Sequence, residues 1–564
     1  MNQNIYERER NKMKNFKILI LILLSSCFKD INLPYKNKNI NEELILAIKQ
    51  NDLSKVLALI EKGVDINYIH SDKSILEIAI DHSKLGILKI LFIKFTVLNN
   101  DLTLGKLLLY ASSLGNNEIV NFLIQLGANV NTKGDCGDSP LIYAARNNSL
   151  KTFILLIEKE ADVNANNIYG ITPLMNAASN GSLEIMNILI ACKVDINCRN
   201  MHGNTALMYA SQANNLLLVK ILLDKGADVN LENINGETAL MFACQNKNYK
   251  LIELLLEKGA DIFHRSKNGN TALIISSKYN NKEILKILIK KNLESVNYKN
   301  NYGETALMFA AYYGYLDIFN ILLNNYANIN EVNIFGETVL MYAIKKNNLE
   351  IIKVLIKKGV KIDIANKEEE TTLIYSFKYG DDDVVNFLLK AGANLNYKTS
   401  YGFNYLMYAS MYGRYSIVCK LLDENVPINE KNFYGETALM YAAKENHIKI
   451  VEVLIERGAN VNEDNWMHRD TPLIYASSLG NLEIAKFLVK KGANVNYKNI
   501  HGKTALMYAA ENGCFNSLKF LINSGADIKA KSNFGKTVLN YAKKADSPYI
   551  IRYLLELEET NKNN

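Results

Sequence analysis

The side chain best placed for chemistry in this sequence is the thiol of Cys27. Lys14 and Lys17 precede an unbroken apolar run, Ile18 to Leu24, which is followed by two serines and then Cys27. The run is too short to span a bilayer, because a spanning helix needs about 20 apolar residues. Basic residues before such a run and small residues after it are typical of an export signal that is cleaved. We therefore expect residues 1–26 to be a signal peptide.

The segment Leu24-Ser25-Ser26-Cys27 resembles the lipobox of bacterial lipoproteins. In that family the cysteine sulfur receives a diacylglyceryl group and the chain is cut just before the cysteine, so the resemblance implies lipidation at Cys27. Residues 27–40 would then be a tether, and the protein would be lipid-anchored in the cell envelope without spanning the membrane. A short buried helix or a chance string is the competing interpretation, which would leave the protein cytoplasmic or secreted.

The true start of the chain is a second open point in this region. Glu7 and Glu9 are unusual in the basic leader of an export signal, whereas Met13 followed by Lys14 would make a clean beginning. Both Met1 and Met13 therefore remain candidate starts.

The other reactive side chains are scattered. Cys192 and Cys198 are close enough in sequence to bridge in an oxidising compartment, but free thiols fit their spacing better. A catalytic alternative would group His468 with Asp470 and Glu463 on one turn. The sequence contains no glycine-rich phosphate loop and no nucleophile elbow that would support it. We expect no enzyme activity, no metal or other cofactor, and no small-molecule substrate.

The charge of the chain is weak for its length. The formal net charge is +7 over 564 residues, and loss of residues 1–26 removes five basic and two acidic side chains, which lowers it to +4. Lysines alternate with acids, as in Glu257-Lys258, so a solvated surface explains them better than a nucleic-acid face. We expect no DNA or RNA partner.

The elements that must position any site are set by a repeat. The phrase Thr-Ala-Leu-Met-Tyr-Ala occurs at 205–210, 437–442 and 504–509, and a Gly-x-Thr step recurs mostly every 33 residues. Aligning the small residue that ends the phrase gives sixteen units between Ala47 and Ala542. Such a period predicts stacked units that bury their apolar faces against their neighbours. The sequence therefore predicts an all-α repeat solenoid of about 16 repeats over residues 41–545, closed by a capping helix and tail at 546–564.

Each unit reads as a turn followed by two helices. In one of them Thr172 can cap the first helix and Pro173 fits its first turn. After Gly181 a second helix carries Ile185, Ile188 and Leu189 on one face. Glycines such as Gly226 suit the left-handed end of a second helix.

At this point the chain resembles the ankyrin-repeat family, whose phrase is Gly-x-Thr-Pro-Leu-His-x-Ala. Thr172-Pro173-Leu174 and Thr471-Pro472-Leu473 match it closely, but methionine stands where the family has histidine. Family histidines make hydrogen bonds to the turns, and we expect side-chain packing to replace those bonds here. The resemblance also implies binding of a protein or peptide on a concave surface made by the turn tips and the first helices.

Large exposed-looking side chains mark where a partner would bind. They stand at turn tips or near the ends of first helices, and tyrosine combines broad contact area with a hydroxyl. Packing between neighbouring tips and the abundance of tyrosine, 32 in all, are competing explanations. The candidate partner-binding residues are Tyr302, Tyr312, Tyr313, Phe335, Tyr379, Tyr401, Met411, Tyr412, Phe433, Tyr434 and Trp466. Among them, we expect the helix-end residues to form one aromatic strip with the tip residues Tyr302 and Tyr401, and these helix-end residues are Tyr312, Tyr313, Tyr379, Met411 and Tyr412.

These features together predict a non-enzymatic scaffold for protein binding, exported and anchored through Cys27. A secreted or surface effector that binds a host protein is the alternative in the same class, and a purely structural spacer is a further one.

Overall fold

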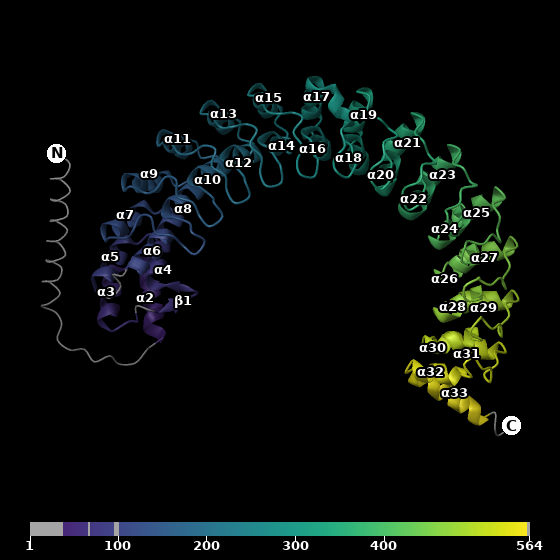
Figure 1. Cartoon of the computed structure of the whole chain (residues 1–564). Helices are drawn as coiled ribbons and strands as arrows, with labels where there is room; N and C mark the ends of the chain where they lie inside the picture. Colours follow the sequence, from purple (N-terminus) through teal and green to yellow (C-terminus); the bar gives the residue numbers. More distant parts are fainter. Residues whose placement is uncertain (1–37, 66–67, 95–100, 561–564) are drawn as a thin grey trace, which may run out of the picture. The chain divides into compact units, whose positions relative to one another are not determined.

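The computed structural model describes residues 38–65, 68–94 and 101–560. The expected signal peptide, Cys27 and most of the expected tether lie outside these residues. Contacts divide the chain into two units, residues 1–267 and 268–564, and each is described by itself. Within each unit, first and second helices of successive repeats form two parallel rows (Figure 1). The described residues contain sixteen helix pairs, which confirms the predicted all-α repeat solenoid.

In unit 1, a short antiparallel hairpin accompanies the helices, with Ile69 opposite Ser74. Its elements are α2 Lys38–Gln50, α3 Leu53–Glu61, β1 Ile69–His70, β2 Lys73–Ser74, α4 Ile75–Asp81, α5 Leu85–Lys94, α6 Asp101–Ser113, α7 Asn117–Gln125, α8 Pro140–Arg146, α9 Leu150–Glu158, α10 Pro173–Asn180, α11 Leu183–Ala191, α12 Ala206–Gln212, α13 Leu216–Asp224, α14 Ala239–Ala243 and α15 Tyr249–Glu257.

Unit 2 has the same alternation, with one 3-10 turn between repeats. Its elements are α16 Ala272–Lys278, α17 Lys282–Lys291, η2 Leu293–Asn297, α18 Ala306–Tyr313, α19 Leu316–Asn324, α20 Val339–Lys345, α21 Leu349–Lys357, α22 Thr372–Tyr379, α23 Asp382–Lys390, α24 Tyr405–Met411, α25 Tyr415–Asp423, α26 Ala438–Lys444, α27 Ile448–Glu456, α28 Pro472–Ser478, α29 Leu482–Lys490, α30 Ala505–Glu511, α31 Phe515–Asn523, α32 Val538–Lys544 and α33 Pro548–Thr560.

The first helices begin where the sequence predicts. Thr172 has extended backbone, and its hydroxyl oxygen accepts a hydrogen bond from the N–H of Met175 at 3.3 Å. Pro173 occupies the first turn, where its missing N–H leaves nothing unpaired. In this repeat the cap therefore fixes the helix start at the residue that follows the turn.

The second helices pack on the first through one face. In α11 the buried side chains are Ile185, Met186 and Leu189, whereas Ile188, which we expected in that stripe, is only half-buried. Gly226 follows the end of α13 with φ +92°, a conformation that glycine adopts without steric cost. Local sequence thus determines both ends of the helix pair.

At nine of the described turn tips, one asparagine holds the turn together. The side-chain oxygen of Asn333 accepts hydrogen bonds from the N–H groups of Phe335 and Glu337, both at 2.9 Å. Its side-chain nitrogen donates to the Glu337 carboxylate at 2.8 Å and to the Tyr342 hydroxyl at 3.1 Å. Because this asparagine is buried, the tip is satisfied without water. The same double acceptance is made at eight further tips by Asn167, Asn200, Asn233, Asn300, Asn366, Asn432, Asn465 and Asn499.

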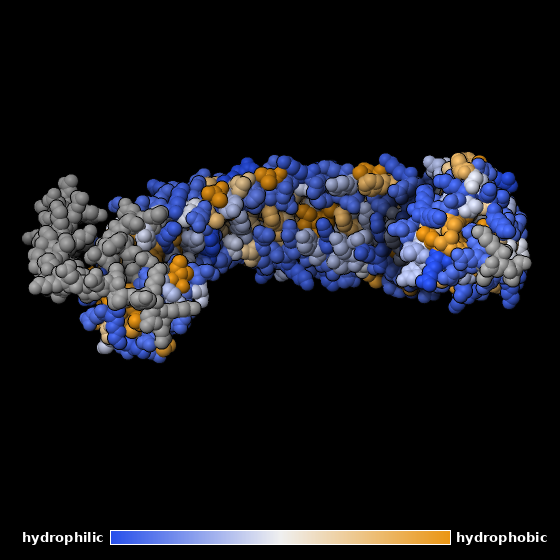
Figure 2. Space-filling view, turned by 90° about the horizontal axis from the view of Figure 1, so that it is seen from below, coloured by the Kyte–Doolittle hydropathy of each residue, from blue (hydrophilic) through white to orange (hydrophobic). Residues whose placement is uncertain are grey.

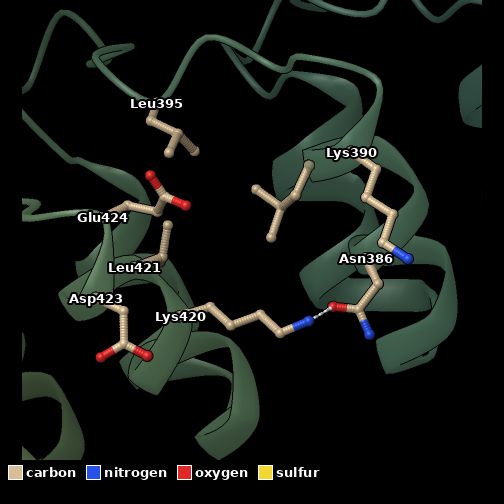
Figure 3. Close-up of a pocket in the computed structure, with 8 residues that line it drawn as sticks. Asn386, Lys390, Leu395, Lys420, Leu421, Asp423 and Glu424 are labelled. Carbon is tan, nitrogen blue, oxygen red and sulfur yellow. Dashed lines mark hydrogen bonds between the residues drawn. The ribbon is translucent and has the colours of Figure 1, made fainter.

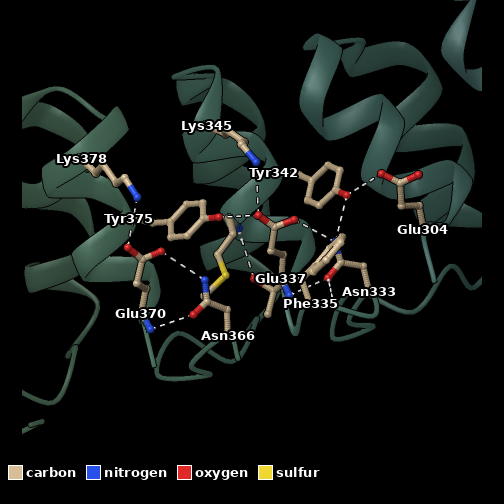
Figure 4. A network of polar contacts seen from close by, with 12 residues as sticks. Glu304, Asn333, Phe335, Glu337, Tyr342, Lys345, Asn366, Glu370, Tyr375 and Lys378 are labelled. Carbon is tan, nitrogen blue, oxygen red and sulfur yellow. Dashed lines mark hydrogen bonds and ion pairs between the residues drawn. The ribbon is translucent and has the colours of Figure 1, made fainter. Parts of the chain in front are cut away.

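Tyrosines of the first helices link one repeat to the repeat before it (Figure 4). The Tyr342 hydroxyl donates to Glu304 at 2.6 Å, and the Tyr375 hydroxyl donates to Glu337. Lys345 completes the surroundings of Glu337, with its nitrogen 3.2 Å from the carboxylate. Each acid therefore gathers donors from its own repeat and from the next.

This network corrects one expectation from the sequence. The eight methionines at the family's histidine position are at most 2% exposed, so packing does fill that space. The hydrogen bonds to the tips, however, come from asparagine and tyrosine, and packing alone does not replace the histidine. The methionines are Met175, Met208, Met241, Met308, Met341, Met407, Met440 and Met507.

Neighbouring tips also approach closely through their backbones. Gly336 has φ +78°, and a Cβ added to it would lie 3.0 Å from the Cα of Asn366. Glu369 and Arg469, which replace the turn glycine in two repeats, keep the left-handed conformation with φ of +62° and +58°. The turn geometry is thus retained where the sequence loses its glycine.

The environment of Glu337 makes the network sensitive to acid. Burial by itself would raise the pKa of this carboxyl, but hydrogen bonds from Tyr375 and Asn333 and the charge of Lys345 lower it below its usual range. A pKa that is lower in the folded chain than in the unfolded chain stabilises the fold above the unfolded value. That stabilisation is lost as the pH falls through the folded value.

We predict that Glu337→Gln lowers the free energy of unfolding at pH 7 by about 1 kcal/mol, since a charged acceptor is replaced by a neutral one. The deficit should shrink as the pH falls below the usual titration range of a glutamate, where the native carboxyl becomes protonated too. Denaturant unfolding from neutral to acid pH measures it. The control is Glu350→Gln, an exposed acid that contacts Lys353, which should change stability by less than about 0.5 kcal/mol at any pH. A pH-independent deficit for Glu337→Gln would contradict this account.

Candidate partner-binding surface

The candidate residues all lie in unit 2, on the face made by the turn tips and the first helices α18 to α28. They fall into two groups. The tip row contains Tyr302, Phe335, Tyr401, Phe433, Tyr434 and Trp466, and the helix-end row contains Tyr312, Tyr313, Tyr379, Met411 and Tyr412.

The tip row is fixed by backbone hydrogen bonds between repeats. The N–H of Phe433 donates to the carbonyl of Tyr401 at 2.8 Å, and the N–H of Trp466 donates to the carbonyl of Tyr434 at 2.9 Å. The rings of Tyr401 and Tyr434 stack with centroids 6.2 Å apart. Part of each ring's surface is therefore used in packing between tips, as the competing interpretation of the sequence supposed.

The tip row nevertheless leaves large apolar areas in contact with solvent. Phe433 is 69% exposed, Trp466 60% and Phe335 56%. The row is interrupted at Lys367 and Glu368, which occupy the tip after that of Phe335. Exposed aromatic groups on rigid supports are typical anchors of protein interfaces.

The helix-end row contains more ring contacts. Tyr312 packs edge-on against Tyr313 at 5.1 Å and contacts Tyr342 of the next repeat at 6.1 Å. Tyr412 stacks on Tyr408 at 6.5 Å. Tyr313 keeps 41% of its surface exposed. The rings of this row thus pack against other rings, and part of their surface remains exposed to solvent.

The two rows do not form the single strip that we expected. The tip row lies before the start of each first helix, and the helix-end row lies at its end. Since α18 is eight residues long, its two ends are about 12 Å apart. Within the part of the chain that the structure describes, no ring contact joins Tyr302 to Tyr312 or Tyr401 to Tyr412. The prediction of spatial adjacency between the rows is therefore wrong.

Tyrosines that the sequence analysis did not select lie between the rows. Tyr342 and Tyr375 are buried, with hydroxyls bound to acids, and Tyr408 is half-buried. Burial, with the nearby charge of Glu370, raises the pKa of Tyr408 to about 12, so its hydroxyl stays protonated at neutral pH. The tyrosine that recurs in the repeat phrase is the feature of the sequence that could have identified these residues.

Lysine side chains also lie over rings of the helix-end row. The Lys346 nitrogen lies 5.1 Å from the ring centroid of Tyr312, and the Lys378 nitrogen lies 5.2 Å from that of Tyr379. Contacts between a cation and a ring face are attractive and help to orient both side chains. The helix ends therefore present rings and positive charge together.

Apolar side chains on the face seen in Figure 2 gather in separate patches among hydrophilic residues. A continuous apolar surface would favour permanent association, whereas separated anchors with polar surroundings are usual where partners bind and dissociate.

The catalytic alternative receives no support from the geometry. His468 packs on His501 with ring centroids 5.8 Å apart, Asp470 accepts a hydrogen bond from Asn499 at 2.8 Å, and Glu463 pairs with Lys431 at 2.7 Å. Burial raises the pKa of Asp470, which a proton-transferring group could use. No hydrogen bond among the described residues, however, joins the three side chains into one site.

None of the thiols in the described part of the chain forms a disulfide. Cys192 is exposed at the end of α11, and Cys198 is half-buried, where burial raises the pKa of its thiol. Across residues 38–65, 68–94 and 101–560, no group of three or more histidine, cysteine or acidic side chains is placed to hold a metal ion.

A surface hollow of about 460 Å³ lies between α23 and α25, the second helices of two neighbouring repeats (Figure 3). Lys420 reaches across it to donate a hydrogen bond to Asn386, and Asp423 and Glu424 border it on the other side. None of the candidate residues lines this hollow, so it is separate from both rows.

Among the described helices, none has both the length and the apolar character needed to cross a bilayer.

Comparisons with known proteins agree with the repeat geometry. A family model described as ankyrin repeats (3 copies) matches residues 107–200, 174–266, 263–333, 325–399 and 406–499. A second model, ankyrin repeats (many copies), matches residues 488–542. No curated protein matches the chain. Repeats of this kind mediate binding between proteins and are typically not enzymes. Since the matched segments cover well over half of the sequence, the chain belongs to the ankyrin-repeat family.

Proposed function

We propose that this protein is a non-enzymatic scaffold that binds another protein or a peptide segment on the first-helix face of unit 2. The observation that carries the proposal is the set of exposed aromatic side chains on supports that are already fixed. Phe433 and Trp466 stand on tips that hydrogen bond to their neighbours, and Tyr313 stands at the end of a capped helix. Rigid anchors reduce the entropy that binding must overcome.

We further propose that the protein is exported and lipid-anchored through Cys27. The support is the sequence from Lys14 to Cys27, because these residues lie outside those that the structure describes. Such an anchor would hold the chain at a membrane surface, where a scaffold meets its partners at raised local concentration. Attachment by two or more acyl chains is stable, whereas a single chain gives marginal binding.

We predict that the triple variant Tyr313→Ala, Tyr379→Ala, Tyr412→Ala loses partners that the native chain captures from membranes of the native cell. Loss of each interface anchor costs about 2 kcal/mol, and because such losses do not add in full, the three together should weaken binding by at least about 100-fold. Crosslinking followed by quantitative mass spectrometry measures capture. The matched control is Tyr326→Ala with Tyr549→Ala, two tyrosines that are 79% and 80% exposed away from this face. Thermal unfolding by circular dichroism checks that each variant is folded. Equal capture by all three proteins would contradict binding on this face.

We predict that Cys27→Ala moves the protein from the membrane fraction to the soluble fraction, because alanine has no sulfur to receive a lipid. Fractionation of the native bacterium measures this, with protease treatment of intact cells to separate a surface location from a periplasmic one. Cys192→Ala, which removes an exposed thiol far along the chain, serves as the control and should stay with the membrane. If the native protein and Cys27→Ala were both soluble in the cytoplasm, the anchor proposal would be wrong.

A further inference from the structure

The ends of the first helices in unit 2 carry an excess of positive charge. Over 312–315, 345–348, 378–381 and 411–414 the basic side chains are Lys345, Lys346, Lys378 and Arg414, and the one acid is Asp381. Asp381 is engaged in capping α23, since its carboxylate accepts from the N–H of Val384 at 3.0 Å. We refer to Lys345, Lys346 and Lys378 as the basic edge.

The lysines of the basic edge differ in how far they are neutralised. Lys345 and Lys378 each lie 3.2 Å from a tip acid, Glu337 and Glu370 respectively (Figure 4). Lys346 is exposed, and within the described residues it makes no ion pair; its nitrogen lies over the ring of Tyr312. Lys346 is therefore the cation most available to a partner.

The turn tips of the same repeats carry acids, two of which pair with lysines of the basic edge. The tips of these repeats contain Glu304, Glu337, Glu368, Glu369 and Glu370, with Lys367 among them. Glu337 and Glu370 are at most 9% exposed and Glu369 is half-buried, whereas Glu368 is exposed. The face thus carries acids along the tips and lysines with tyrosines along the helix ends.

We propose that the basic edge binds an acidic segment of the partner protein, with carboxylates opposite Lys346 and its neighbours and with aromatic or aliphatic groups against Tyr313, Tyr379 and Tyr412. This proposal rests on the proposed function and specifies the partner's chemistry. The tip acids repel such a segment, so the charge pattern decides which side of the face it occupies. Lysine provides the charge, and the rings provide contact area that does not depend on salt.

A nucleic acid fits this surface less well than an acidic protein segment. A phosphate backbone needs an uninterrupted positive track, since each phosphate carries a full charge. Here Glu337, Glu370 and Asp381 lie among the lysines. A short stretch of acids separated by apolar residues needs only the exposed Lys346 and the exposed ring of Tyr313 beside it.

The test uses the full chain and a fluorescein-labelled peptide of repeated Glu-Glu-Tyr units, with Gln-Gln-Tyr and Lys-Lys-Tyr peptides for comparison. Fluorescence anisotropy should show tightest binding for the acidic peptide, weakened when salt rises from about 50 to about 300 mM. Lys346→Glu should weaken acidic-peptide binding at least about fivefold. The control Lys357→Glu makes the same charge change on the second helix α21 of that repeat, where Lys357 is exposed, and should alter binding less than about twofold.

Equal binding of the acidic and glutamine peptides, or equal effects of Lys346→Glu and Lys357→Glu, would overturn the proposal. Preferential binding of single-stranded oligothymidine would overturn it too, in favour of a nucleic-acid partner. Loss of partner capture in the tyrosine variant together with any of these results would mean that the face binds a partner of other chemistry. Unchanged capture in that variant would instead show that the proposed function itself has failed.

Discussion

The structure depends on the hydrogen bonds that close each turn tip and join it to the next repeat. A tip contains several backbone N–H groups that no helix pairs, and these groups need other acceptors. Asn333 pairs two of them and also orients Glu337, which in turn accepts the hydroxyl of Tyr375 from the following repeat. Since each repeat contacts only its neighbours, the stability of each unit depends on such links between adjacent repeats.

The same network also fixes the helix ends and tips that support the candidate binding face. Tyr342 and Tyr375 are buried with their hydroxyls committed to acids, so the helix ends and tips on either side of them are held in place. Tyr313 and Phe433 can then remain exposed without the cost of ordering their supports on binding. The hydrogen bonds that replace those of the family's histidine therefore also hold the candidate binding surface in place.

Much of this could be predicted from the sequence, because it depends on contacts close in the chain. The cap at Thr172 and the glycine ends of second helices follow from residues within a few positions of each other. The bond between Tyr342 and Glu304 joins residues 38 positions apart, and the repeat period gives no side-chain direction. For that reason the sequence predicted packing at Met341 but missed the polar link beside it. The expected strip failed for a related reason, since spacing alone placed Tyr302 near Tyr312 although a whole helix lies between them.

A double-mutant cycle between Glu337 and Tyr375 tests the central claim most directly, because it isolates the link between two repeats. Denaturant unfolding of the native chain, Glu337→Ala, Tyr375→Phe and the double variant would give the coupling free energy. We predict a coupling of at least about 1 kcal/mol, and near-zero coupling when Glu350→Ala, an exposed acid of α21, replaces Glu337→Ala. Additivity within about 0.3 kcal/mol for Glu337 and Tyr375 would contradict the claim that this bond couples neighbouring repeats.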